Sequence, residues 1–316
     1  MSDKKYIVQS RLPGWDQRSL ERGTALVIGV GGLGLPAALY LAAMGIGALI
    51  LADPDTVAEE NLHRQPLYTP HDIGRPKVEV LADHLSRLRP DIRLSLYPLW
   101  VEERFLREIG IEADIWIDGT DNLESRLCID KMAQELRKPW VYGAIFQWEG
   151  QVGLLERASY QEIFGTGLEA PSCTEAGVIG ALPGIIGSWQ AALAAQYLAD
   201  PWGVPRNRLF RVDLRRGESH TFWLPASPLP ALDLTSAEVR CLPNPYWIDV
   251  REEATPLPFP AEKKSPYIWE EWTLPAQPVI IICETGNRSR QIAYALRRRT
   301  GRGDIYSLRG GAALLR

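Results

Sequence analysis

The sequence predicts an α/β protein with a doubly wound, mostly parallel sheet, followed by a second and smaller α/β domain. Three observations lead to this fold class. Short apolar runs alternate with helix-like runs of roughly 10 to 15 residues through the first part of the chain. A glycine-rich turn joins the first apolar run to the helix-like run that follows it. After a proline-rich stretch, the alternation starts again.

The first domain is predicted to contain five strands in βαβ units. Strand-like runs span residues 24–30, 47–53, 92–98, 113–121 and 139–146. Helix-like runs at 35–45, 77–90 and 125–138 lie between them. Parallel neighbours need such crossover connections, so the sheet is expected to be mostly parallel and Rossmann-like. Residues 147–156 and 208–224 are expected to add antiparallel strands, with a helix at 181–200 between them.

A proline-rich segment separates the two predicted domains. Proline lacks the amide donor that helices and sheets require, so residues 225–232 are expected to form a semi-rigid linker. The domains then span residues 1–224 and 233–316. In the second domain the expected elements are a helix at 235–242, strands at 246–252, 278–283 and 304–308, and a helix at 290–299.

Composition argues against several classes of protein. The formal net charge of −4 does not suit a nucleic-acid binder, which needs a basic surface. No run reaches roughly 18 uncharged apolar residues, so no membrane span or signal peptide is expected. The four cysteines, Cys128, Cys173, Cys241 and Cys283, form no CxxC pair. Free thiols and a cytoplasmic location are therefore expected.

The turn after the first strand has the composition of a phosphate-binding loop. Gly29, Gly31, Gly32 and Gly34 lie between a strand and a helix in "VIGVGGLG". Glycines let the backbone approach phosphates, and the helix N-terminus adds free N–H groups and a partial positive charge. Asp53 ends the second strand, where a carboxylate binds ribose hydroxyls. These features alone fit a nicotinamide-dependent oxidoreductase as well as an ATP-binding protein.

Polar residues beyond the second strand favour ATP. Asn61, Arg64 and Gln65 follow that strand, and Lys77 begins the next helix. They are expected at the carboxyl edge of the sheet, where ligands of doubly wound folds bind.

Two carboxylates, Asp118 and Asp121, reach the same edge at the end of the fourth strand. Two cations and two carboxylates around one phosphate site suit ATP with magnesium better than a nicotinamide cofactor. Of the two carboxylates, we expect Asp118 to be structural.

Five motifs resemble those of the ThiF/MoeB-type adenylyltransferases, relatives of the ubiquitin-activating enzymes. They are "GVGGLG", "DPDTVAEENLHRQ", "GRPK", "DGTDN" and "EGQV", in this order, and the resemblance covers roughly residues 6–224. It implies a homodimer that adenylates the C-terminal glycine of a small ubiquitin-like sulfur-carrier protein and releases pyrophosphate. Carried over by position, Asp53 would hold the ribose of ATP, Asn61, Arg64 and Lys77 the phosphates, and Asp121 a magnesium ion.

The chain departs from this family's pattern in two places. Many members hold a structural zinc with two CxxC pairs, which are absent here, so we predict no zinc. Val8 stands where members carry an arginine that reaches into the partner subunit's ATP site, and Arg11 is a candidate replacement. The resemblance also makes Cys173 the crossover-loop cysteine, which can bond covalently with the activated carrier. A packed small residue is the alternative.

A second reactive cysteine is predicted in "CETGNRS", residues 283–289. A strand delivers Cys283 to a loop, and a helix N-terminus with Arg288 favours its thiolate. The stretch resembles the active-site loop of rhodanese sulfurtransferases, whose cysteine carries a persulfide. Glu284 beside it disfavours the thiolate, and the domain is short in its middle. An inert Cys283 is therefore the alternative.

The leading hypothesis joins both domains. The first makes an acyl-adenylate on a β-grasp carrier, and a Cys283 persulfide then attacks it to give a thiocarboxylate. Two alternatives stay open: a non-catalytic scaffold that docks a ubiquitin-like partner, and an NAD(P)-dependent oxidoreductase.

Overall fold

In the computed structural model, the chain divides into two compact units. One comprises Met1–Arg157 and Pro171–Thr221, and the other Ala158–Ala170 and Phe222–Arg316. The structure describes residues 3–156, 158–165, 177–201, 203–224, 233–235, 238–239, 242–251, 256–266, 269–284, 286–300, 302–308 and 311–315. The predicted linker at 225–232 lies outside these residues.

An eight-stranded sheet forms the first part of the fold, in the order β3-β2-β1-β4-β5-β6-β7-β8. Its strands are β1 Thr24–Ile28, β2 Ala48–Ala52, β3 Arg93–Tyr97, β4 Ile115–Asp118, β5 Trp140–Phe146, β6 Glu149–Leu155, β7 Arg208–Asp213 and β8 Glu218–Trp223. The first five strands in this order pair in parallel, whereas β6 is antiparallel to β5 and to β7. The strand order reverses between β1 and β4, as in doubly wound sheets. The predicted fold class is confirmed.

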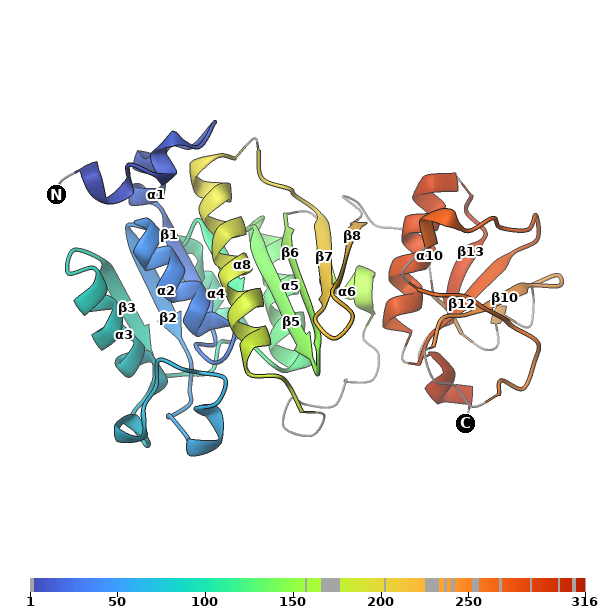
Figure 1. The fold of residues 1–316 in the computed structure, drawn as a ribbon, viewed down its shortest axis with the longest axis horizontal. Helices are drawn as coiled ribbons and strands as arrows, with labels where there is room; N and C mark the ends of the chain where they lie inside the picture. The colour runs from blue at the N-terminus through green and yellow to red at the C-terminus, as the bar shows by residue number, and fades with distance from the viewer. Residues whose placement is uncertain are drawn as a thin grey trace. The chain divides into compact units, whose positions relative to one another are not determined.

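Helices cover both faces of this sheet (Figure 1). The α-helices are α1 Gln17–Arg22, α2 Gly34–Met44, α3 Lys77–Leu88, α4 Glu103–Glu108, α5 Leu123–Leu136 and α8 Ala181–Ala199. Short 3-10 helices are η1 Asp3–Tyr6, η2 Gln9–Arg11, η3 Glu59–Asn61, η4 Pro70–Asp72 and η5 Gly110–Glu112. Helices α2 and α8 pack against each other on one face, and α4 and α5 lie on the other. Among the described helices, none is both long and apolar enough to cross a membrane.

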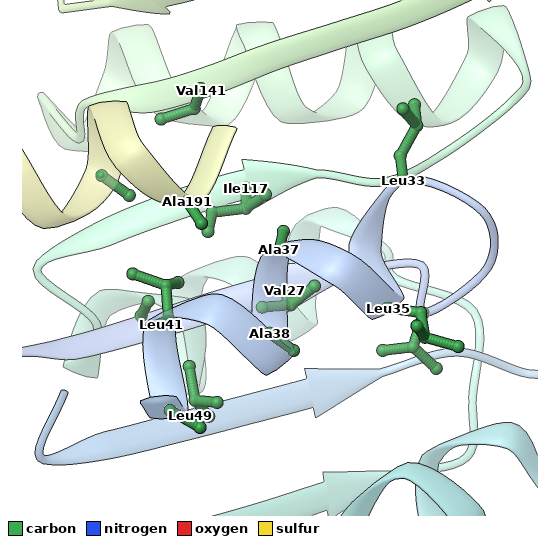
Figure 2. Close-up of a cluster of buried hydrophobic side chains, with 14 of the residues drawn as sticks. Val27, Leu33, Leu35, Ala37, Ala38, Leu41, Leu49, Ile117, Val141 and Ala191 are labelled. Atoms are coloured by element: carbon green, nitrogen blue, oxygen red, sulfur yellow. The ribbon is translucent and has the colours of Figure 1, made fainter. Parts of the chain in front are cut away.

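The core of the first unit lies between α2, α8 and the strands. Figure 2 shows ten labelled side chains of this cluster: Val27, Leu33, Leu35, Ala37, Ala38, Leu41, Leu49, Ile117, Val141 and Ala191. Residues of β1, β2, β4 and β5 contribute from the sheet, and small alanines on α2 and α8 let the two helices approach closely. Burial of these side chains stabilises the unit by roughly 25 cal/mol per Å² of apolar surface.

The β1–α2 turn is closed by backbone contacts that only glycine permits. Gly29 has a φ of +83°, which favours glycine. A Cβ atom on Gly34 would lie 1.8 Å from the carbonyl oxygen of Gly29, and one on Gly119, after β4, would lie 2.2 Å from that same oxygen. The turn therefore packs directly against the loop that follows β4.

The second unit has its own parallel sheet in the order β11-β10-β12-β13-β9. Its elements are α6 Tyr160–Phe164, β9 Asp233–Leu234, β10 Tyr246–Asp249, β11 Glu262–Lys263, η6 Trp269–Glu271, β12 Val279–Ile282, α10 Asn287–Thr300, β13 Ile305–Leu308 and η7 Gly311–Leu315. A small core gathers Val239, Ile280, Ile282, Leu308 and Ala312. The predicted second α/β unit is confirmed. Helix α6, assigned by its sequence position to the first domain, lies against α10 in this unit.

Replacement of Gly34 by alanine is expected to destabilise the first unit by more than about 2 kcal/mol, because the added methyl group clashes with backbone rather than with a flexible side chain. The urea midpoint, followed by far-UV circular dichroism, measures the loss. Gly184→Ala is the matched control, since a Cβ there meets nothing within 4 Å. That change lies in a helix and should be neutral or stabilising by up to about 1 kcal/mol. Equal midpoints for the two variants would contradict the backbone constraint.

Candidate functional site

Asp53 lies at the C-terminal end of β2, directly beside the glycine turn. Its side chain is buried, and its two oxygens accept hydrogen bonds from the N–H of Val30 at 2.7 Å and of Asp55 at 2.8 Å. Burial raises the pKa of Asp53, and the nearby Lys77 ammonium opposes that rise. The carboxylate is thus held in one orientation at the carboxyl edge of the sheet, the place predicted for it.

Lys77, the first residue of α3, is also buried. Its Nζ lies 2.8 Å from the Asp55 carboxylate, and its N–H donates to the Asp55 carbonyl at 3.0 Å. Tyr68 fixes the same region, because its hydroxyl donates to the carbonyl of Val30 at 2.8 Å. Burial and the charge of Asp53 raise the pKa of Tyr68 far above its usual value. One cation and one neutral hydroxyl therefore flank the glycine turn.

Gln65 brings a free acceptor to the turn. Only 3% of the residue is exposed, and its Oε1 has no hydrogen-bond partner among the described residues. A Cβ atom on Gly31 would meet only the Nε2 of Gln65, at 3.4 Å, so protein atoms leave space beside this glycine. A buried acceptor without a donor costs about 1–3 kcal/mol. The Gln65 atom nearest this space is Nε2, a hydrogen-bond donor, which suits the phosphate oxygens of a nucleotide.

Asn61 and Arg64 belong to the turn that precedes Gln65. The carbonyl of Asn61 accepts from the N–H of Arg64 at 3.1 Å and of Gln65 at 3.0 Å. The Arg64 guanidinium is half-buried and donates to the carbonyl of Glu60 at 2.9 Å. In the described part of the chain it forms no ion pair, so its charge is available to an anionic ligand.

The end of β4 is organised by an arginine that no sequence pattern singled out. The fully buried Asp118 accepts from the N–H and hydroxyl of Thr120, and from Nε of Arg126 at 3.0 Å. Arg126, from α5, also donates to the carbonyls of Thr120 and, at 3.0 Å, of Gly143 on β5. Burial raises the pKa of Asp118, and Arg126 opposes that rise. Both oxygens of Asp118 are engaged within the protein.

Asp121, three residues further on, is exposed, and its carboxylate accepts no hydrogen bond from the described residues. The next residue, Asn122, caps α5 by accepting from the N–H of Ser125. Among the described residues, no group of three or more histidine, cysteine and acidic side chains is arranged to hold a metal. A single free carboxylate fits magnesium, which completes its shell with phosphate oxygens and water.

Cys283 follows β12 in the second unit and is 4% exposed. Among the described residues, three donors lie near its Sγ: the N–H of Gly286 at 3.1 Å, and the N–H and hydroxyl of Ser289 at 3.4 and 3.3 Å. The φ of Gly286 is +92°, which turns its amide toward the sulfur. Arg288, also predicted for this site, lies half-buried in the first turn of α10. The loop thus directs hydrogen-bond donors at the sulfur.

A second unforeseen arginine changes the electrostatics around Cys283. Arg251 is buried and pairs with Asp249 through two hydrogen bonds of 3.0 Å. Its Nη1 also lies 3.9 Å from the carboxylate of Glu284. Glu284, the acid next to Cys283, thus has a guanidinium near its carboxylate, although Asp249 already pairs with the same guanidinium.

Three further residues named in the sequence analysis are Cys173, Val8 and Cys128. Cys173 lies outside the described residues. Val8, at the position of the family's trans arginine, is 77% exposed on the N-terminal segment. Cys128 in α5 is half-buried, and burial raises the pKa of its thiol.

Comparisons with known proteins agree with the motifs. The model of the ThiF family matches residues 5–230. The sulfur carrier protein adenylyltransferase of Thermus thermophilus is 37% identical over 193 residues, covering 58% of this chain and 71% of that protein. The adenylyltransferase and sulfurtransferase MOCS3 of Culex quinquefasciatus is 34% identical over 215 residues, covering 66% of this chain and 49% of that protein.

Among solved structures, a complex of Escherichia coli MccB has a similar fold, with a TM-score of 0.58 at 21% identity over 67% of each chain. The family match ends at residue 230, so the likeness of residues 233–316 to rhodaneses stays a prediction.

Loss of Arg126 should destabilise the fold at the C-terminal end of β4. Arg126→Ala leaves the Asp118 carboxylate buried without its cation, and we expect a loss of about 3–5 kcal/mol, measured by urea unfolding. Arg104→Ala removes an exposed pair, with Glu108, and should leave the urea midpoint nearly unchanged. Adding Asp118→Asn to Arg126→Ala should recover part of the loss. If Arg126→Ala lowers the urea midpoint no more than Arg104→Ala does, Arg126 does not anchor the end of β4.

Proposed function

The chain belongs to the ThiF family, and from this premise we propose that it uses ATP to adenylate the C-terminal carboxylate of a small sulfur-carrier protein. One observation carries the proposal. The glycine turn packs against the loop after β4, so backbone N–H groups, the Asp53 carboxylate and the free Asp121 carboxylate belong to one edge of the sheet. The sulfur carrier named for the Thermus relative supports the choice of substrate.

ATP would be held from its ribose to its phosphates by residues of this edge. Asp53 would accept from the ribose hydroxyls, and the glycine turn and the N-terminus of α2 would receive the phosphates. Arg64, Lys77 and Asn61 would complete the phosphate contacts. Magnesium, bound through Asp121, would supply charge neutralisation at the α-phosphate.

Adenylation needs positioning and charge compensation more than covalent help from the protein. The carboxylate oxygen of the carrier attacks the α-phosphorus, the bond to the bridging oxygen breaks, and pyrophosphate leaves with the electron pair. Lys77 and Arg64 offset the charge that develops on the phosphate oxygens. Family membership favours this reaction over hydride transfer with a nicotinamide cofactor.

The second unit is proposed to supply sulfur. The outer sulfur of a Cys283 persulfide attacks the carbonyl carbon of the acyl-adenylate and expels AMP, which leaves the carrier in an acyl disulfide with Cys283. The Cys173 thiol then attacks Sγ of Cys283, forming a disulfide and releasing the thiocarboxylate. A cellular thiol reduces that disulfide before the next cycle. Support comes from the donors around Sγ and from the sulfurtransferase named among the relatives.

The thiol chemistry suits a reducing compartment, and we place the protein in the cytoplasm as a homodimer. Because Val8 stands where the family carries its trans arginine, the dimer's ATP site would work without that arginine, or with Arg11 in its place.

Asp121→Asn and Lys77→Met are each expected to slow carrier-dependent exchange of pyrophosphate into ATP by about 100-fold or more, because each removes charge compensation at the phosphates. Glu124→Gln is the matched control, since this exposed acid lies in the first turn of α5 and should leave exchange unchanged. Tight NAD binding without pyrophosphate exchange in the unmodified protein would overturn the adenylation proposal.

Cys283→Ser should separate the two activities. We expect normal pyrophosphate exchange but no thiocarboxylate, because the variant activates the carrier and lacks the sulfur nucleophile. Mass spectrometry of a β-grasp carrier, incubated with ATP and a persulfide donor, reports replacement of one C-terminal oxygen by sulfur. Cys128→Ser serves as the control. Undiminished thiocarboxylate from Cys283→Ser would remove the second unit from the reaction and favour a scaffold role for it.

A further inference from the structure

The glycine turn contains one peptide whose orientation depends on a side chain from elsewhere in the chain. The peptide before it is fixed by the N–H of Val30, which donates to Asp53 at 2.7 Å. The peptide after it is fixed by the carbonyl of Gly31, which accepts from the N–H of Leu35 at 3.0 Å. Between these two, the carbonyl of Val30 accepts from the hydroxyl of Tyr68 at 2.8 Å. No other donor among the described residues bonds that carbonyl.

Tyr68 is itself held firmly in place. It is 3% exposed, and its N–H donates to the carbonyl of Gln65 at 3.1 Å. Its hydroxyl also lies 3.3 Å from the carbonyl oxygen of Lys77, at the start of α3. Because burial raises the pKa of Tyr68 far above its usual value, the hydroxyl keeps its proton. The side chain therefore joins the glycine turn to the helix that carries Lys77.

The direction of the Val30 carbonyl sets the direction of the next N–H. The bond between Val30 and Gly31 is trans, and the C=O and N–H of a planar trans peptide point in opposite directions. With its carbonyl turned to Tyr68, this peptide directs the N–H of Gly31 away from that side chain. In the described part of the chain this N–H meets no acceptor, and protein atoms leave space beside Gly31. Glycine tolerates many backbone angles, so the Tyr68 bond is what selects this orientation.

We propose that Tyr68 is a positioning residue for nucleotide binding, because its hydroxyl fixes the peptide that presents the Gly31 N–H to a phosphate group of ATP. Tyr68 acts through the Val30 carbonyl and does not touch the nucleotide. The inference rests on the proposed use of ATP. Since Asp53 keeps its bond to the Val30 N–H whether or not the hydroxyl is present, the effect falls on the phosphates and not on the ribose.

Tyr68→Phe keeps the buried ring and removes the hydroxyl alone, so it tests this role in the full-length chain. We expect the Kd for ATP, with magnesium present, to rise about 10-fold, because a backbone donor is no longer held toward a charged group. The Kd for adenosine, which has the ribose but no phosphate, should stay nearly unchanged. Isothermal titration calorimetry measures ATP binding, and equilibrium dialysis with radiolabelled adenosine measures the weaker ligand.

A purely structural hydroxyl would give a different result. Its loss would lower the urea midpoint and the folded fraction, which reduces the binding of both ligands together and leaves the ratio of their Kd values unchanged. Tyr197→Phe is the matched control. It removes the hydroxyl of a half-buried tyrosine in α8, whose ring centre lies 5.5 Å from the guanidinium carbon of Arg206. This variant should bind ATP and adenosine as the unmodified chain does.

Carrier-dependent pyrophosphate exchange separates this inference from the adenylation proposal. In a chain that adenylates, Tyr68→Phe should raise the KM for ATP about 10-fold. Exchange with an unchanged KM, or equal weakening of ATP and adenosine, would reject the role of Tyr68 and leave adenylation standing. A selective loss of ATP affinity in a chain that exchanges no pyrophosphate would uphold that role and reject adenylation instead.

Discussion

The contact of three glycine backbones at the centre of the first sheet determines where the other site residues lie. Gly29, Gly34 and Gly119 approach one another so closely that a side chain on Gly34 or on Gly119 would overlap the carbonyl oxygen of Gly29. This contact joins the turn after β1 to the loop after β4 at the point where the strand order reverses. Asp53 is then bound to the turn through Val30, and Arg126 fixes the far side of the β4 loop through Asp118.

The candidate sites of the two units share one arrangement of strand, loop and helix. In each, a parallel strand delivers a loop whose glycine has positive φ, followed by a helix. In the first unit, protein atoms leave space beside Gly31, and the nearest side-chain atom there is Nε2 of Gln65. In the second unit the donors are already occupied by the chain's own sulfur. The first arrangement suits a substrate that comes and goes, and the second suits a nucleophile that must stay in place.

The fold, and the residues expected at the carboxyl edge of the first sheet, were predictable because they depend on local patterns. Alternating apolar runs give the parallel strands, and the residues directly after those strands share an edge whatever the loops do. Arg126 and Arg251 could not be found this way. Arg126 lies in an amphipathic helix where a cation normally faces solvent, and its value comes from Asp118 and from Gly143 on another strand. Arg251 matters because folding brings it to Glu284, thirty-three positions later in the chain. Likewise, nothing local assigns α6 to the second unit.

The ion pair between Lys77 and Asp55 has a consequence for turnover. In the absence of a nucleotide, Asp55 neutralises a lysine that is almost wholly withdrawn from water. In the proposed reaction, a phosphate that binds Lys77 would compete with this carboxylate, and the carboxylate would pair with the lysine again when pyrophosphate departs. The lysine would then never be an uncompensated buried charge, so its attraction for pyrophosphate would be weaker. Under the proposed reaction, Asp55 lowers the affinity for phosphate and in return favours release of pyrophosphate.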